Sequence, residues 1–362
     1  LINLEFWQNF SAPNVVLIRS EKQKGFETNP SQHFSILRAL LERTNLYESV
    51  DQSEYWKVLA DELDWAEPIT VPIQRPAPCP PLSARPDHLS ATQIEDLMLN
   101  PYNIFVSTIL KIRPLKPVDA KLGPADFGKM VHAALEQFIV TNPTALPNHP
   151  LQQLLKIGRR IFEPIQERPE VFPFWWSRFE RLAHFFLEDE RQNRSSRSSS
   201  HTEVSGSMSL KLPHRNFTLT AKADRIDQRT DGTIDIVDYK TGLLPTAPQI
   251  LSGRKPQLLI ETIIALRGSY QKIPRKEVHA LVSLRLNGGL PPGQRQSIEE
   301  EISPRAMEFL SWLGDLLLVF DSEDTPYYAL PSGNLVARKN EYEHIARVAE
   351  WHTNVSSDRH QT

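Results

Sequence analysis

The sequence of 362 residues predicts an α/β protein with a mixed central sheet flanked by helices. Asp231-Gly232 separates two β-rich runs, and this dipeptide is a strong signal for a β-hairpin. Apolar runs at 234–239 and 278–284 have the length of buried strands, and a helical pattern at 256–266 lies between them. Strands separated by a helix, with further helices before and after them, favour a sheet with helices packed on it.

Composition and charge exclude several classes of protein. The net charge of −3 gives no global basic signature for nucleic acid, so any such surface has to be local. The single cysteine, Cys79, excludes disulfides within this chain and metal sites built from several cysteines. No apolar run approaches the roughly 20 residues of a membrane span, and there is no signal peptide. We therefore expect a cytoplasmic protein with no membrane partner, and we interpret the start at Leu1 as that of a fragment.

Two structural regions joined by a linker are expected. Residues 1–67 contain too few elements for an independent core, namely one strand-like run and two helical patterns, at 14–19, 33–46 and 53–64. We interpret this region as the C-terminal edge of a larger α/β domain. Residues 68–88 are rich in proline, which disfavours helix and favours an extended spacer. A second domain is expected over residues 89–362.

The second domain is expected to open with a well-defined helix. Ser90 and Gln93 form a capping-box pattern before an apolar run, so we place a helix over 91–99 that ends before Asn100-Pro101. A second helix-like run follows at 104–112.

Later elements follow from apolar spacing. An amphipathic helix over 127–139 carries His132 one turn from Glu136. The stretch 191–200 is rich in serine and arginine and is interpreted as a mobile loop. Other helices are expected at 151–161, 174–189, 304–320 and 341–351, and other strands at 202–204, 208–212 and 217–223.

Three charged residues beside the predicted hairpin are candidates for chemistry. Asp238 and Lys240 lie two apart on a predicted strand, so their side chains project to the same side. Asp224 lies near the end of the preceding strand and is expected alongside them. An acidic residue and a lysine that emerge from a buried strand require partners or a metal ion. The pattern indicates either a site for a hard divalent cation and an activated water, or the charged end of a surface hairpin.

These residues also carry a resemblance to a known family. Asp224-Arg-Ile-Asp227, a turn, and Val237-Asp-Tyr-Lys-Thr-Gly242 resemble the core motif of the RecB-like branch of the PD-(D/E)xK nucleases. Other family elements stand in the same order and have similar sequences, at 89–95, 100–102, 127–136 and 256–261. Together with the segment 342–351, the pattern is similar to AddB, the nuclease-bearing subunit of bacterial double-strand-break repair helicase–nucleases. The likeness covers about residues 89–352.

The resemblance implies a restriction-endonuclease-like core and a Mg²⁺- or Mn²⁺-dependent deoxyribonuclease, exonuclease or endonuclease. It implies that the enzyme acts on DNA in recombinational repair, in a heterodimer with an AddA-type helicase–nuclease subunit. Residues 1–67 would then be the remnant of a helicase-like domain. The alternative is a nuclease-like module that has lost catalysis and binds DNA or a partner. No iron–sulfur cluster is expected, because Asn100 stands before Pro101 where many relatives have cysteine. A second departure from the family pattern is Ala221, which stands where the family often has glycine and leaves the carboxylates in place.

The same resemblance assigns roles to individual residues. Asp224 and Asp238 would be metal ligands, joined by His132 and the backbone carbonyl of Tyr239. Lys240 would orient or deprotonate the attacking water and offset charge in the transition state. Gln257 would hold the strand near Lys240 or contact DNA, or else only begin its helix.

Four further residues are weaker candidates. Glu203 would hold a metal-bound water, or would be an exposed glutamate at a strand edge. Glu136 and Glu261 are expected to lie behind the ligands. Asp227 is expected to pair with Arg225 rather than to bind metal.

Overall fold

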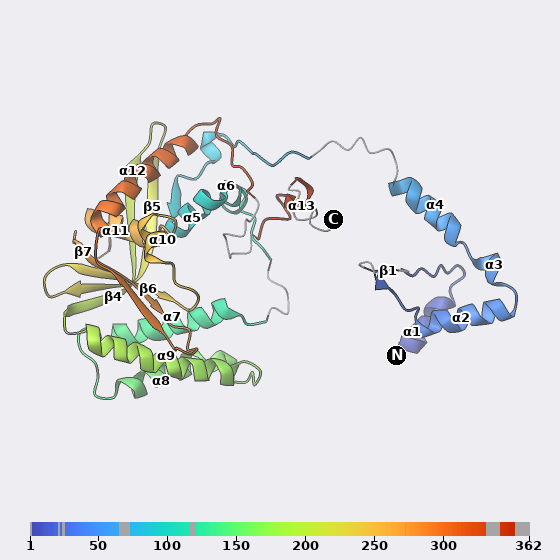
Figure 1. The fold of residues 1–362 in the computed structure, drawn as a ribbon, viewed down its shortest axis with the longest axis horizontal. Helices are drawn as coiled ribbons and strands as arrows, with labels where there is room; N and C mark the ends of the chain where they lie inside the picture. The colour runs from blue at the N-terminus through green and yellow to red at the C-terminus, as the bar shows by residue number, and fades with distance from the viewer. Residues whose placement is uncertain are drawn as a thin grey trace, which may run out of the picture. The chain divides into compact units, whose positions relative to one another are not determined.

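The computed structural model describes residues 2–20, 22–23, 26–64, 73–115, 121–271, 273–330 and 341–351. The chain divides into two compact units, Leu1–Pro72 and Ile73–Thr362 (Figure 1). In the described part of the chain, no helix combines the length and the apolar character required to cross a membrane.

The first unit has little packing of its own. It contains four helices and a two-strand hairpin, namely α1 (Ile2–Phe10), β1 (Lys22–Gln23), β2 (Phe26–Glu27), α2 (Gln32–Arg43), α3 (Tyr47–Val50) and α4 (Ser53–Asp64). None of the side chains described in this unit is buried. The prediction of a buried strand at 14–19 is wrong, because this segment is exposed coil that no other described element of the unit covers.

The second unit is built on a six-stranded mixed sheet. Its strands are β3 (His88–Ser90), β4 (Arg197–Lys211), β5 (Asn216–Arg229), β6 (Ile234–Lys240), β7 (Val278–Arg285) and β8 (Gln294–Ile298). Their order is β3-β5-β6-β7-β8, and β4 pairs with β5. The Asp231-Gly232 turn joins β5 and β6 as an antiparallel hairpin, whereas β6 and β7 run parallel. A mixed sheet flanked by helices is the fold class that the sequence predicts.

Helices cover both faces of this sheet (Figure 1). One layer contains α7 (Pro124–Thr141), α8 (Pro150–Ile161) and α9 (Phe172–Asn193), and the other contains α5 (Ala91–Leu99), α11 (Gln257–Arg267) and α12 (Ile302–Phe320). Side chains of β6 alternate between the two layers, with Ile234 and Ile236 on the α11 side and Val237 and Tyr239 on the α7 side. The remaining helical segments are Leu82–Ala84, α6 (Pro101–Ile104), a π-helical turn at Phe105–Ile109, Glu163–Ile165, α10 (Ala247–Leu251) and α13 (Val348–Trp351).

The side chains of β5 alternate between the two faces of the sheet, and this alternation shifts by one residue at Asp224. Ala221 and Ala223 pack on the α11 side of the sheet, but so does Ile226, three residues after Ala223. Side chains of a regular strand alternate at every residue, so the backbone must be irregular between these positions. On β4, Glu203 has a left-handed φ of 50° at this level, a conformation that costs a residue other than glycine roughly 1–3 kcal/mol. Before this point β5 exposes one face to solvent, and after it helices cover both faces.

A buried ion network anchors α9 to the sheet. Arg225 is 1% exposed and donates to Glu190 Oε1 at 2.7 Å and to both Asp227 oxygens at 2.7 and 2.8 Å. Arg197 contacts Glu190 at 2.9 Å and Asp227 at 3.0 Å, and Arg194 contacts Glu190 at 3.2 Å. The network joins the end of α9 to β4 and β5, and it confirms the expected pairing of Asp227 with Arg225.

The prediction of a mobile loop at 191–200 is therefore wrong. Asn193 ends α9 and Arg197 begins β4, which runs without a break to Lys211 and includes the two short strands expected there. Composition gave the wrong result because the carboxylates that bind Arg194 and Arg197 are Glu190 and Asp227. Asp227 lies 30 residues after its partner Arg197, so no pattern within 191–200 reveals this pairing.

Several other boundaries differ from those expected. Of the expected linker at 68–88, residues 68–72 lie outside the described residues, and Pro76 and Pro78 accept backbone hydrogen bonds from Ala329 and Tyr327. The chain from Ile73 therefore belongs to the second unit. The helix expected at 341–351 is a series of turns up to residue 347, and only α13 is helical. The capping box of Ser90 and Gln93 is present as predicted.

Replacement of Glu190 by glutamine should lower the free energy of unfolding by about 3 kcal/mol, because three arginines lose a fully buried counter-charge. The matched control is Glu188→Gln, two residues earlier on α9, where the side chain is 58% exposed, forms an ion pair with Arg191 and accepts from Gln192. The control should change stability by less than about 1 kcal/mol. Urea unfolding of both variants measures the difference, and equal effects would contradict the network's role.

The same glutamate should make stability depend on acid pH. Burial alone raises the pKa of Glu190, but Arg225 and Arg197 outweigh burial and lower the pKa from 4.5 to about 2. A carboxyl whose pKa is lower in the folded state binds fewer protons there, so its stabilisation is complete above pH 4.5 and is lost as the pH falls toward 2. The difference in unfolding free energy between wild type and Glu190→Gln should therefore shrink on acidification from pH 6 toward 2. A difference that stays constant over this range would show that the carboxylate charge is not what stabilises the fold.

Candidate metal centre

Three side chains from three elements converge where β5 changes phase. His132 of α7, Glu203 of β4 and Asp224 of β5 each offer one ligand atom, and these atoms all lie within 4.8 Å of one another. All three side chains are partly buried. An imidazole and two carboxylates at this separation can bind one divalent cation, with room for water.

Asp224 is fixed by the neighbouring strand. Its Oδ2 accepts a hydrogen bond from the backbone N–H of Tyr239 at 2.8 Å and lies 3.6 Å from His132 Nδ1. Burial and the adjacent Asp238 raise the pKa of the Asp224 carboxyl above its usual value. His132 is held edge-on to the ring of Tyr239, with the ring centroids 5.8 Å apart. The sequence-based prediction that Asp224 comes alongside β6 is thus confirmed.

Glu203 is closer to the centre than the sequence indicated. Its carboxylate belongs to the three-residue group and also pairs with the Lys222 ammonium. β5 is the described strand with which β4 pairs, so Glu203 does lie on an edge strand, but its side chain is only 27% exposed and contacts Lys222. Its left-handed backbone has no sequence signal, because glutamate is not a residue that favours this conformation.

Asp238 and Lys240 form a second group on β6 with Gln257 at the start of α11. Lys240 Nζ donates to Asp238 Oδ1 at 2.7 Å and to Gln257 Oε1 at 3.2 Å. The Gln257 amide donates to Asp238 Oδ1 at 3.0 Å and to Glu261 Oε1 at 3.1 Å. Burial lowers the pKa of Lys240, but Asp238 outweighs burial, so the net shift is upward. Lys240 is therefore an ammonium held in place by two acceptors.

Asp238 is placed differently from the expectation that it binds metal together with His132 and Asp224. It is not a member of the group in which ligand atoms lie within 4.8 Å, and its Oδ1 already accepts from Lys240 and Gln257. It still lies near enough to raise the pKa of Asp224, after burial itself. The two groups therefore adjoin, with Asp238 between Lys240 and the three potential ligands.

Of the other weaker candidates, Glu261 contacts the second group, because its Oε1 accepts from the Gln257 amide. It is 1% exposed, and burial and Asp238 raise the pKa of its carboxyl well above the usual value. Glu136 is not part of the three-residue group. Tyr239 donates its backbone N–H to Asp224, and its hydroxyl accepts from Arg225. Metal binding by its carbonyl stays a prediction.

Comparison with known proteins agrees with this geometry. Residues 88–331 match the model of the PD-(D/E)XK nuclease superfamily. The chain belongs to this superfamily. The match begins at β3 and spans the described sheet, both helix layers and all of the candidate residues.

Similar individual proteins add little about function. An uncharacterised protein of Rickettsia bellii is 30% identical over 185 residues, and one of Rickettsia felis is 28% identical over 189 residues. Each match covers 51% of this chain but 22% of the relative, so the chain spans about a fifth of the length of these relatives. The crystal structure of SSO0001 aligns with 62% of this chain and 85% of its own at 12% identity, and its TM-score of 0.23 is too low to support an argument.

The grouping of His132, Glu203 and Asp224 predicts a Mn²⁺ site that can be measured in the absence of DNA. Glu203→Gln should weaken Mn²⁺ binding at least about tenfold, because one anionic ligand is lost. Glu136→Gln is the control, since Glu136 lies one turn from His132 on α7 but outside the group. Isothermal titration calorimetry distinguishes the two variants. Loss of affinity only in Glu136→Gln would move the centre along α7.

Proposed function

We propose that this chain is a metal-dependent deoxyribonuclease that hydrolyses phosphodiester bonds at the two adjoining groups on β5 and β6. The observation that supports the proposal most strongly is the position of Lys240, held by Asp238 and Gln257 next to the acidic group of Asp224. Membership of a nuclease superfamily supports hydrolysis of a phosphodiester bond as the reaction. Asp224, Asp238 and Lys240 are the charged residues that could carry it out.

The residues present fit a hard divalent cation. Asp224, Glu203 and His132 would hold Mg²⁺ or Mn²⁺, with Asp238 and the carbonyl of Tyr239 as further oxygen ligands. When bound, the ion lowers the pKa of a coordinated water and withdraws charge from the scissile phosphate. A cation also offsets the repulsion between Asp224 and Asp238 that raises the pKa of Asp224.

Lys240 provides the positive charge that the phosphate requires. An ammonium has three N–H donors, of which Asp238 and Gln257 accept one each. The third N–H can donate to the attacking water or to a phosphate oxygen. The Lys240 side chain is 36% exposed and is therefore accessible to both. Gln257 is a positioning residue, because its one amide group fixes Lys240 and Asp238 together.

We further propose an AddB-type role in recombinational double-strand break repair, with an AddA-type motor subunit as partner. The motifs at 89–102, 256–261 and 342–351 support this assignment. Relatives in which the matched region is 22% of the length leave room for a motor-like part, of which residues 1–67 would be the end. The nuclease domain expected over 89–362 would then extend back to Ile73, so that only the first residues of the expected linker would join the two parts. Copurification of the full-length protein with such a helicase subunit tests the assignment, and no association would contradict it.

Replacement of Lys240 by alanine should lower the rate of Mg²⁺- or Mn²⁺-dependent DNA degradation by about 10²–10³-fold, because a donor to developing phosphate charge is lost. EDTA should stop the wild-type reaction. The control, Lys156→Ala, removes the same charge from an exposed position on α8 and should leave the rate within about twofold. Degradation of labelled single-stranded DNA measures all three.

A wild-type rate in Lys240→Ala would contradict the assignment of the site. DNA binding without any metal-dependent cleavage by the wild-type chain would instead favour the alternative, a nuclease-like module that only binds DNA or a partner.

A further inference from the structure

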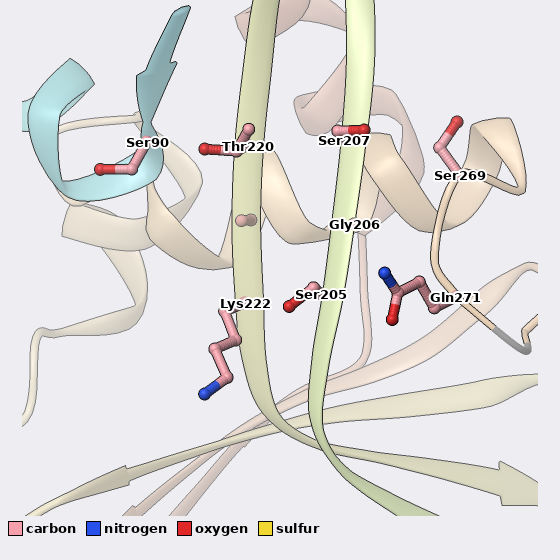
Figure 2. Close-up of a pocket in the computed structure, with 9 residues that line it drawn as sticks. Ser90, Ser205, Gly206, Ser207, Thr220, Lys222, Ser269 and Gln271 are labelled. Atoms are coloured by element: carbon pink, nitrogen blue, oxygen red, sulfur yellow. The ribbon is translucent and has the colours of Figure 1, made fainter.

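A hollow of about 400 Å³ lies on the solvent-facing side of β4 and β5, and its lining includes Gly206 and Ala221 (Figure 2). Four hydroxyl groups form a row across it, from Ser90, Thr220, Ser207 and Ser269. A second row contains Lys222, Ser205 and Gln271. None of the three candidate ligands His132, Glu203 and Asp224 is among the residues that line it.

The hollow lies on the same two paired strands that carry Glu203 and Asp224 of the metal centre. Ser207 pairs with Thr220 and Ser205 pairs with Lys222 across the strands. One step further, two pairs of residues flank Glu203 and Asp224, namely Val204 with Ala223 and Thr202 with Arg225. The Lys222 ammonium, on the second row, pairs with the Glu203 carboxylate of the centre. Successive rows are two residues apart, about 7 Å along a strand, so the hydroxyl rows lead directly to the candidate ligands.

The lining suits a chain of phosphates. Solvent-facing strands can carry long charged side chains of both signs, whereas the described lining residues are mainly short hydroxyls with Lys222. Hydroxyls, an amide and an ammonium can all donate to phosphate oxygens, and among the described lining residues there is no carboxylate to repel them. No aromatic side chain lines it either, so the hollow offers no surface on which bases could stack. A ligand here would be held by its backbone and not by its bases.

We propose that this hollow binds the phosphodiester backbone of a single DNA strand and leads that strand to the metal centre. The proposal rests on the proposed function for the class of substrate. A volume of about 400 Å³ has the size of a small-molecule site, which accommodates one or two nucleotide units rather than a duplex. Binding through the backbone alone would be independent of sequence and sensitive to salt.

The test compares two serines of β4 in the complete 362-residue chain. Ser207 lines the hollow, whereas Ser209 is exposed on the same side of the same strand, pairs with Thr218 and does not line the hollow. The probe is a fluorescein-labelled oligo(dT) of about 15 nucleotides, and its anisotropy is measured in EDTA so that it is not cleaved. Ser207→Glu should weaken binding about fivefold or more, because it places a carboxylate beside a phosphate, and Ser209→Glu should stay within about twofold.

Ser207→Lys tests whether a loss of binding in Ser207→Glu is due to misfolding. The added cation should tighten oligo(dT) binding in Ser207→Lys but not in Ser209→Lys, and a misfolded protein would not bind more tightly. Equal effects at both positions, no effect at Ser207, or stronger competition by duplex than by unlabelled single strand would each overturn the proposal.

The binding and cleavage experiments separate this proposal from the proposed function. Oligo(dT) binding that depends on Ser207, without any metal-dependent cleavage, would support the hollow and contradict the nuclease. Cleavage that depends on Lys240, with oligo(dT) binding indifferent to both Ser207 variants, would support the nuclease and overturn the hollow.

Discussion

The buried guanidinium of Arg225 is the constraint on which the rest of the nuclease unit depends. It is 1% exposed, and burial alone would lower its pKa, but Asp227 and Glu190 outweigh burial and keep it protonated. A charge in this position is tolerated only if its partners are fixed, because an unpaired buried charge is very costly. Arg225 therefore fixes the end of α9 against β5, and through the hydroxyl of Tyr239 at 3.0 Å it also fixes β6.

The contact between Arg225 and Tyr239 also determines where the neighbouring aspartates of the candidate site lie. Asp224 precedes Arg225 on β5 and Asp238 precedes Tyr239 on β6, so the pair held inside the protein places the two aspartates next to each other. The phase change at Asp224 and the left-handed backbone of Glu203 then leave these carboxylates at the border between covered and open parts of the sheet. Asp224 is partly open to solvent there, while Asp238 is buried, and the burial and the neighbouring carboxylate that raise the pKa of Asp224 favour a cation as its partner.

Much of this arrangement could be predicted from the sequence, because its signals are local. The Asp231-Gly232 turn, the spacing of Asp238 and Lys240 and the capping box at Ser90 each act over a few residues, and each is present in the structure. What sequence reasoning missed depends on distant partners. The arginines of 191–200 looked like a solvated loop because their carboxylates lie on another helix turn and another strand, and the short strands β3 and β8 form only where β5 and β7 provide a neighbour. The position of Glu203 in the metal group coincides with a left-handed backbone conformation, which no sequence pattern predicts for glutamate.

Asp224 belongs to the group proposed to hold a divalent cation, and Asp238 joins that group to the one that presents Lys240. The most direct measurement is the anomalous scattering of Mn²⁺ in crystals of the chain grown with the metal. We expect a single strong peak within bonding distance of an Asp224 oxygen, with His132 and Glu203 around it and Lys240 beyond Asp238. A saturating concentration of Mn²⁺ that leaves this place empty, or that fills a site away from Asp224, would contradict the account.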